Sequence, residues 1–168
     1  MVRDERPGDA AAVREVNVAA FPTSAEADLV DALRDRAAPL VSLVAEEDGS
    51  VVGHLMCSPA TLDGHPEVRL MGLAPMAVVP ARQARGIGAA LVREAVARCR
   101  ALGVDGLIVL GHPGYYPRFG FVPASRWGIR CEYDAPDEAF MAMELRPGAL
   151  AERSGTARYH PCFADLDA

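Results

Sequence analysis

The sequence predicts one domain of mixed α/β class, in which helices flank a mixed, mostly antiparallel sheet. Two hairpin turns, Asp48-Gly49 and Asp63-Gly64, separate strand-like apolar segments in the first half. A strand, a helix and another strand follow over residues 68–110, and this order after the hairpins indicates a mixed sheet. At 168 residues the chain is long enough for one core and short for two.

Residues 1–79 are expected to hold two helices and four strands. In order they are a strand near Val2, a helix from Ala10 to about Ala20 capped by Asp9, a helix capped by Ser24 that runs through Arg36, and strands at 40–45, 51–57 and about 68–79. Leu29, Val30 and Leu33 fall on one side of the second helix, so that side should face the core.

The segment after residue 79 is expected to form a helix and three further strands. Pro80 stops the preceding strand, and residues 83–88 open a helix that ends near Leu102-Gly103. One face of this helix should be buried because apolar residues recur at helical spacing: Ile87, Leu91, Ala95, Cys99 and Leu102. We expect a buried strand at 106–110, a helical turn around 115–119, and strands at 121–123 and 140–145.

Composition excludes several classes of function. The net charge is -6 and no basic run is present, which argues against general nucleic-acid binding. No apolar run reaches the roughly 18 to 20 residues that a membrane helix needs, and the polar amino terminus is not a secretory signal. We therefore expect a cytoplasmic protein. The cysteines match no metal or redox spacing, so we interpret them as reduced, with Cys99 in the core.

The turn before the third helix has the features of an anion site. Amides in the first turn of a helix lack partners and point outward, and the helix dipole adds about half a positive charge there. Gly86 and Gly88 leave room for phosphate oxygens, although a glycine before a helix is more often structural. A nucleoside-triphosphate loop is excluded because no Gly-Lys-Ser/Thr follows, and Leu91 replaces the third glycine of a dinucleotide fingerprint.

Two motifs give the chain a family resemblance. Met76-Ala77-Val78-Val79-Pro80 followed by Gln83-x-x-Gly86-x-Gly88 resembles the cofactor motif of the GCN5-related N-acetyltransferases (GNAT). Tyr115-Tyr116-Pro117-Arg118-Phe119-Gly120-Phe121 resembles their Tyr-x-x-x-Gly-Phe element. One helix and one strand separate the two motifs, as this superfamily requires, and the likeness to a bacterial subgroup of predicted N-acetyltransferases extends over the whole chain.

The resemblance implies a GNAT fold over residues 1–168, with a core of about 2–146, a carboxy-terminal extension of 147–168, and a sheet that splays around the cofactor. It implies acetyl-CoA as the cosubstrate and no metal. Ala84 stands where the subgroup often has glycine, and His112 where it often has an acidic residue. The residues expected to bind the cofactor are Met76, Ala77, Val78, Gln83, Ala84, Arg85, Gly86, Ile87, Gly88, Ala89 and Tyr116.

By the same resemblance, an amine attacks the thioester directly and Tyr116 protonates the departing thiolate. A phenol has a pKa near that of a thiol, so a phenol can protonate a thiolate. The alternative is that Tyr116 only packs beside the cofactor, as we expect of Tyr115. The general base stays open among Glu26, His112 and His54, or a chain of waters, although His54 fits a satisfied core histidine better.

Other functions and partners stay open. The chain fits an acetyltransferase that acts on a primary amine, a non-catalytic acyl-CoA sensor, or a transferase that uses a longer acyl chain or an oxygen acceptor. Arg82, Arg85 and Arg118 are candidates for phosphate contacts. The acceptor is either a small molecule or a protein amine, and a homodimer is one possible assembly.

Overall fold

The computed structural model describes residues 1–167, and the side chains of residues 1–164. The chain forms two compact units. The first unit contains residues 1–58 and 74–95 and the tail from Pro161, and the second contains residues 59–73 and 96–160. No helix in the described part of the chain combines the length and the hydropathy that a membrane crossing requires.

Three α-helices and short 3-10 turns accompany the strands. The helices are α1 (Ala10–Ala20), α2 (Ala25–Arg36) and α3 (Ile87–Ala101). The strands are β1 (Val2–Asp4), β2 (Val41–Glu47), β3 (Ser50–Leu62), β4 (Leu70–Val78), β5 (Gly106–Leu110), β6 (Val122–Pro123), β7 (Ile129–Cys131), β8 (Phe140–Glu144) and β9 (Gly155–Arg158). The 3-10 turns are η1 (Pro7–Asp9), η2 (Pro80–Arg82), η3 (Tyr116–Phe119), η4 (Ala124–Trp127), η5 (Asp137–Ala139) and η6 (Pro161–Asp167).

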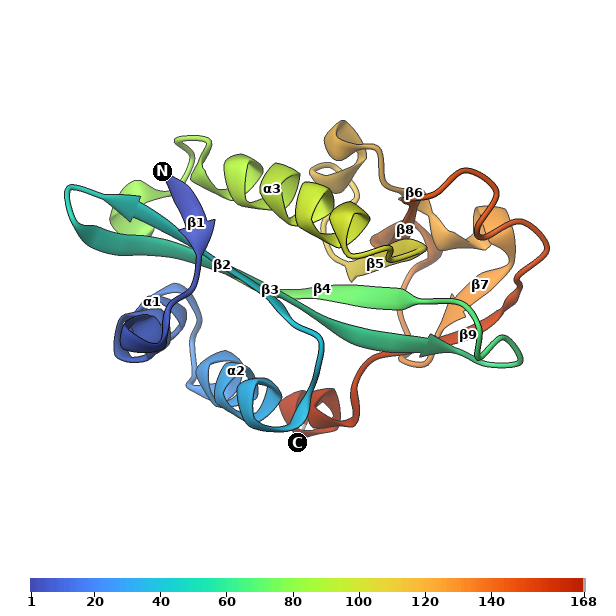
Figure 1. Ribbon diagram of the computed structural model, residues 1–168, viewed down its shortest axis with the longest axis horizontal. Helices are drawn as coiled ribbons and strands as arrows, with labels where there is room; N and C mark the ends of the chain where they lie inside the picture. The colour runs from blue at the N-terminus through green and yellow to red at the C-terminus, as the bar shows by residue number, and fades with distance from the viewer. Residues whose placement is uncertain (168) are drawn as a thin grey trace. The chain divides into compact units, whose positions relative to one another are not determined.

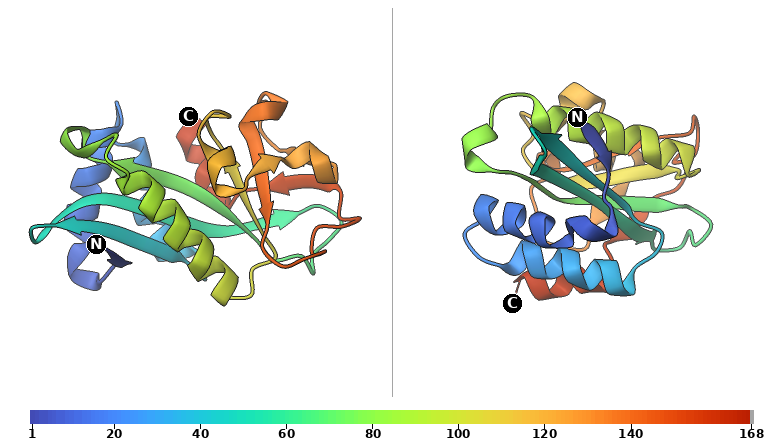
Figure 2. Two further views of the ribbon diagram at one scale, coloured as in Figure 1. Left: turned by 90° about the horizontal axis from the view of Figure 1, so that it is seen from above. Right: turned by 60° about the vertical axis from the view of Figure 1, so that its left-hand side comes forward.

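The sheet of the first unit has the order β1-β2-β3-β4. The pairs β1–β2 and β2–β3 are antiparallel. Helices α1 and α2 lie on one face of these strands, and the first part of α3 lies on the other (Figures 1 and 2). Gly53 lets α3 approach β3, because a Cβ there would lie 3.1 Å from Ile87 Cγ2 and 3.2 Å from Leu91 Cδ1.

In the second unit β4, β5, β8 and β6 follow one another across the sheet. The pairing of β4 with β5 is parallel and covers only Leu70–Gly72, whereas β8 is antiparallel to both β5 and β6. Strand β9 is parallel to β7 and antiparallel to the end of β3. The sheet is therefore mixed and mostly antiparallel, which confirms the predicted fold class.

The structure corrects several details of the expected elements. Strand β3 continues to Leu62, beyond the predicted end at Cys57, because Thr61 and Leu62 pair with β9. On α3, Leu91 and Cys99 are fully buried, but Leu102 is 43% exposed because the helix ends at Ala101. The predicted burial of Leu102 was wrong.

The two predicted helix caps were also wrong in their chemistry. Asp9 and Ser24 do precede α1 and α2, but neither side chain makes a capping bond to its helix. The Asp9 carboxylate instead accepts the Arg6 amide at 2.7 Å and the Arg3 guanidinium at 2.8 Å. Thr23 Oγ1 accepts the Ala25 amide at 3.2 Å, so a neighbouring residue satisfies the start of α2.

Candidate functional site

A tight turn leads from β4 through η2 into α3. The Arg82 amide donates to Val79 O at 2.9 Å, which closes η2. Ala84 and Gly86 then adopt left-handed backbone angles, with φ of 62° and 85°. The side chain of Gln83 crosses the turn and donates from Nε2 to Val78 O at 2.9 Å.

This turn exposes a series of unpaired main-chain donors. Within the described chain, the amides of residues 84–89 donate no main-chain hydrogen bond. The first bond of the helix runs from Ala90 N to Gly86 O at 3.0 Å. Residues 84–86 are exposed and residues 87–89 are half-buried, so solvent or a ligand can reach the donors. Together with the dipole of a 15-residue helix, they make a site for an anion.

The end of β4 offers a second set of main-chain groups. In the first unit β4 is the edge strand of the sheet. Val79 donates to Val52 O of β3 at 2.9 Å. Since successive residues of a strand turn their polar groups to opposite edges, the N–H and C=O of Val78 point to the open edge. An extended amide-containing ligand can pair there as an added strand would.

Arginines lie beside the anion site. Arg82 Nε lies 3.7 Å from Glu47 Oε2, so this ion pair holds it beside the β2–β3 hairpin. Arg85 is exposed and takes part in no ion pair among the described residues. It is therefore the better placed of the two to meet a phosphate.

Tyr116 begins η3 in the second unit and is only 8% exposed. Its ring contacts those of Tyr115 and Phe121 edge to face, with centroids 5.1 and 5.7 Å apart. Gly120 ends the turn with φ of 104°, and its amide donates to Pro117 O at 3.0 Å. Packing and turn geometry thus restrain the ring on several sides.

Glu26 and His112, two of the candidates for the general base, differ in burial. Glu26 is half-buried on α2, and its Oε2 atom is fully buried without a hydrogen-bond partner among the described residues. His112 is exposed in the loop after β5, and its carbonyl accepts the Tyr115 amide at 3.0 Å. A buried carboxylate oxygen without a donor is costly, so Glu26 is suited to receive a donor from a ligand.

His54 is fully buried and belongs to a chain of side-chain hydrogen bonds, as predicted for a core histidine. Ser42 donates its hydroxyl proton to Glu5 Oε2 at 2.6 Å and lies 3.0 Å from His54 Nε2. The ring must therefore donate from Nε2 and accept at Nδ1 from Asn17, 3.3 Å away. Desolvation, and secondly the charge of Arg34, lower the pKa of His54 to about 3.

Arg118 is engaged in its own turn. Its Nε donates to Tyr115 O at 2.9 Å, and its guanidinium carbon lies 4.6 Å from the centre of the Tyr115 ring. The expected contact of Arg118 with a phosphate stays a prediction. Its observed contacts hold residues 114–118 together beside Tyr116.

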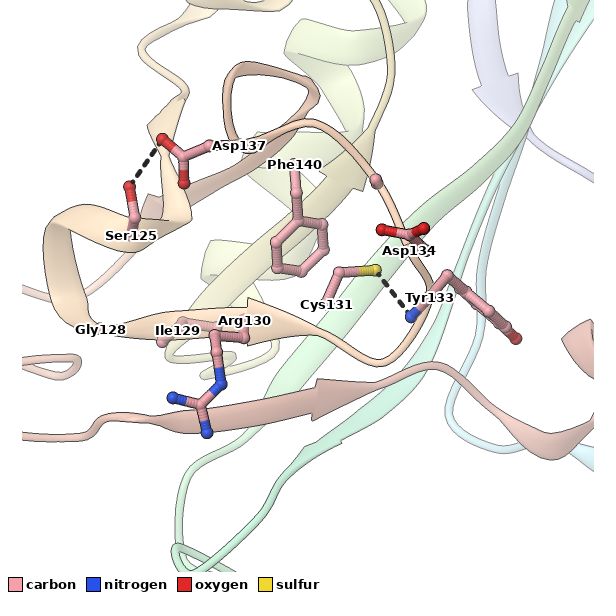
Figure 3. A pocket seen from close by; sticks show the side chains of 10 residues that line it. Ser125, Gly128, Ile129, Arg130, Cys131, Tyr133, Asp134, Asp137 and Phe140 are labelled. Carbon is pink, nitrogen blue, oxygen red and sulfur yellow. Dashed lines mark hydrogen bonds between the residues drawn. The ribbon is translucent and has the colours of Figure 1, made fainter.

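Sequence reasoning missed two hollows, one in each unit. The hollow of the second unit has a volume of about 380 Å³ and lies between β7 and the segment before β8 (Figure 3). The ring of Phe140 points into it and Cys131 lies beside it, its thiol accepting the Tyr133 amide at 3.4 Å. In the first unit, α1 and the β2–β3 hairpin line a hollow of about 540 Å³. No residue predicted for the site lines either hollow, and the short strand β7 gave no periodic signal.

The chain is similar to known acetyltransferases along its length. The acetyltransferase (GNAT) family matches residues 10–121. The uncharacterized N-acetyltransferase YhbS of Escherichia coli is 32% identical over 164 residues, which cover 97% of this chain and 98% of that protein. The uncharacterized N-acetyltransferase YjhQ of Escherichia coli (strain K12) is 42% identical over 134 residues, or 77% of this chain and 74% of that protein.

Solved structures agree with these matches. The crystal structure of YhbS from Escherichia coli in complex with CoA superposes with a TM-score of 0.91, covering 98% of this chain and 91% of that one. A GNAT family acetyltransferase from Brucella melitensis in complex with acetyl-CoA is 39% identical, with a TM-score of 0.78 and coverage of 97% of each chain.

Proposed function

This chain belongs to the acetyltransferase (GNAT) family, and we propose that it transfers the acetyl group of acetyl-CoA to a primary amine. The observation that carries the proposal is the row of unpaired amides at residues 84–89, at the start of α3. Two relatives that are 32% and 39% identical bind CoA and acetyl-CoA, respectively. The pyrophosphate of the cofactor is the anion that this turn would hold.

The cofactor's pantetheine arm pairs with the open edge of β4. Its amides meet the main-chain groups of Met76 and Val78, while Ala77 between them turns its polar groups to β3, and the Val78 N–H faces the thioester. Gln83 keeps the turn in shape through its bond to Val78 O, while Arg85 adds charge beside the phosphates.

The reaction is a direct transfer. The neutral amine nitrogen attacks the thioester carbonyl carbon, forming a C–N bond, and the Val78 amide stabilises the negative oxygen. The C–S bond then breaks, the thiolate takes a proton from the phenol of Tyr116, and the proton that the acylated nitrogen gives up restores the phenol. The role of Tyr116 comes from its match to the family's Tyr-x-x-x-Gly-Phe element.

Glu26 is the candidate for the contact with the acceptor. The incoming amine must lose a proton, and its ammonium form must first be bound. The buried, unpartnered Oε2 of Glu26 can accept a hydrogen bond from either form. His112 is less suited because solvent surrounds it, and the pKa of His54, at about 3, is too low for a base near neutral pH.

A thiol-release assay tests the proposal. Purified protein is mixed with acetyl-CoA and a library of primary amines, and free CoA thiol is followed with a colorimetric reagent. We expect at least one amine to give turnover and Tyr116→Phe to lower kcat about 100-fold, since a general acid contributes on that order. Tyr115→Phe is the matched control, because it removes a neighbouring phenol oxygen and keeps the ring.

Two results would argue against the enzyme. Tight acetyl-CoA binding without thiol release across the whole library would favour a non-catalytic sensor. Turnover with a longer acyl-CoA in preference to acetyl-CoA would redirect the proposal to another acyl donor. Calorimetry with CoA alone measures cofactor binding directly, so it separates these two results from a failure to bind the cofactor.

A further inference from the structure

Gly111 lies against the ring of Tyr116 in the second unit. A Cβ on Gly111 would come within 2.5 Å of Tyr116 Cε2, closer than real Cβ atoms approach a neighbour, and within 3.0 Å of Cδ2. The backbone of Gly111 has no left-handed φ, so glycine is not required there for its conformation. The absence of a side chain at Gly111 leaves the space that the aromatic ring occupies.

The main chain on both sides of this contact is fixed. The Gly111 amide donates to Ala139 O at 2.9 Å, which continues the pairing of β5 with β8. The Tyr116 amide donates to His112 O at 3.4 Å, and Gly120 closes the turn behind it. An added methyl group at position 111 would therefore move the ring and not the backbone.

Aromatic neighbours also pack against the ring. The Tyr115 and Phe121 rings meet it edge to face, and the Phe119 ring centroid lies 6.4 Å away. Gly111 and these rings form a slot that sets the direction of the Tyr116 phenol. Relief of the clash needs a displacement of about 1 Å, a distance that can cost on the order of 100-fold in rate at a reacting group.

We propose that Gly111 is a positioning residue for Tyr116, and this inference rests on the proposed function of Tyr116 as the acid. The first test is kinetic, with acetyl-CoA and an amine that is active in the library. Gly111→Ala should lower kcat 10- to 100-fold and leave the Kd for CoA within about twofold. Gly114→Ala is the matched control, because nothing lies within 4 Å of its added Cβ in the same loop.

A double variant shows whether the effect passes through the phenol. In a Tyr116→Phe background the Cβ still displaces a ring, but that ring carries no acid. Gly111→Ala should then cause no further loss of kcat. Equal losses in the two backgrounds, or full activity of Gly111→Ala, would overturn the proposal.

A spectroscopic test needs no turnover. In protein labelled with ¹³C at the tyrosine ζ carbon, Tyr116→Phe identifies the Tyr116 resonance among the four tyrosines. Gly111→Ala should shift that resonance most, and Gly114→Ala should leave it in place. An unmoved resonance in Gly111→Ala contradicts the slot even if no amine is ever acetylated, so failure of the slot and failure of the proposed function are told apart.

If Gly111→Ala does not fold, a second variant tests whether the new methyl group and the Tyr116 ring compete for the same space. The combination of Gly111→Ala with Tyr116→Ala removes the ring that the new methyl group meets. This double variant should fold and melt close to Tyr116→Ala alone. A double variant that stays unfolded would place the clash elsewhere and overturn the proposal.

Discussion

The side-chain amide of Gln83 donates a hydrogen bond to the main-chain oxygen of Val78, 2.9 Å away. This bond ties the middle of the turn between β4 and α3 back to the last residue of β4. Because Gln83 is exposed, the bond contributes little to the core and acts mainly on the shape of the turn. The shape of the turn, for its part, exposes the row of unpaired main-chain amides at residues 84–89.

We predict that Gln83→Ala weakens CoA binding about 5- to 10-fold. A single neutral hydrogen bond contributes about 1 kcal/mol, which corresponds to a change of this size in Kd. Gln83→Glu should bind more weakly still, because its carboxylate repels both Val78 O and the pyrophosphate. Isothermal titration calorimetry with CoA measures both, and an unchanged Kd for Gln83→Ala would contradict the role of the bond.

Ala84 occupies a left-handed backbone conformation with φ of 62°. An alanine there costs about 1 to 2 kcal/mol relative to a residue without a Cβ. We predict that Ala84→Gly raises the free energy of unfolding by about 0.5 to 1 kcal/mol, since greater entropy of the unfolded chain offsets part of the gain. Urea unfolding measures it, with Ala90→Gly, inside α3, as a control that should lose stability. Loss of stability in Ala84→Gly would contradict the predicted strain.

The sequence predicted best those features that single residues impose. Asp48-Gly49 turns the chain with φ of 50° and 79°, and Pro80 ends β4 at the expected place. Strand β5 has the predicted bounds because its apolar run is short and lies between clear turn signals. The turn before α3 belongs to this group, since its glycines and its position before a helix are local features, while its binding of an anion stays a prediction.

Features that depend on distant partners were not predictable. Strands β7 and β9 have only three and four residues; they pair with each other, and β9 also pairs with the end of β3. The buried oxygen of Glu26 follows from how α2 packs, which no local pattern encodes. The slot at Gly111 likewise needs the ring of a residue on the following turn.

Glu26 gives a prediction on the acceptor side. Glu26→Gln keeps the shape of the side chain but removes its charge and places an NH₂ group where an acceptor is needed. We predict that kcat/KM for the amine falls at least 10-fold, while the Kd for CoA stays within twofold. Glu15→Gln, an exposed glutamate on α1, is the matched control. Equal kcat/KM for Glu26→Gln and wild type would show that Glu26 has no role in the reaction.

His54 makes the stability of the protein depend on pH. Its ordinary pKa is 6.5, and burial lowers the value to about 3 in the folded protein. As the pH falls below 6.5, His54 becomes protonated in the unfolded chain but stays neutral in the folded protein. Stability is therefore full above pH 6.5 and declines towards pH 3, with a slope approaching about 1.4 kcal/mol per pH unit.

His54→Gln tests this dependence. Glutamine can still donate to Ser42 and accept from Asn17, but it does not titrate. We predict that urea unfolding of the wild type loses stability between pH 7 and pH 4.5, and that the variant loses much less over the same range. The Asp9 carboxylate does not confuse the comparison: hydrogen bonds, chiefly from Arg3, lower its pKa from 3.8 to about 2, so its contribution is lost only below this window. If the free energy of unfolding falls equally with pH in the two proteins, a group other than His54 causes the loss of stability in acid.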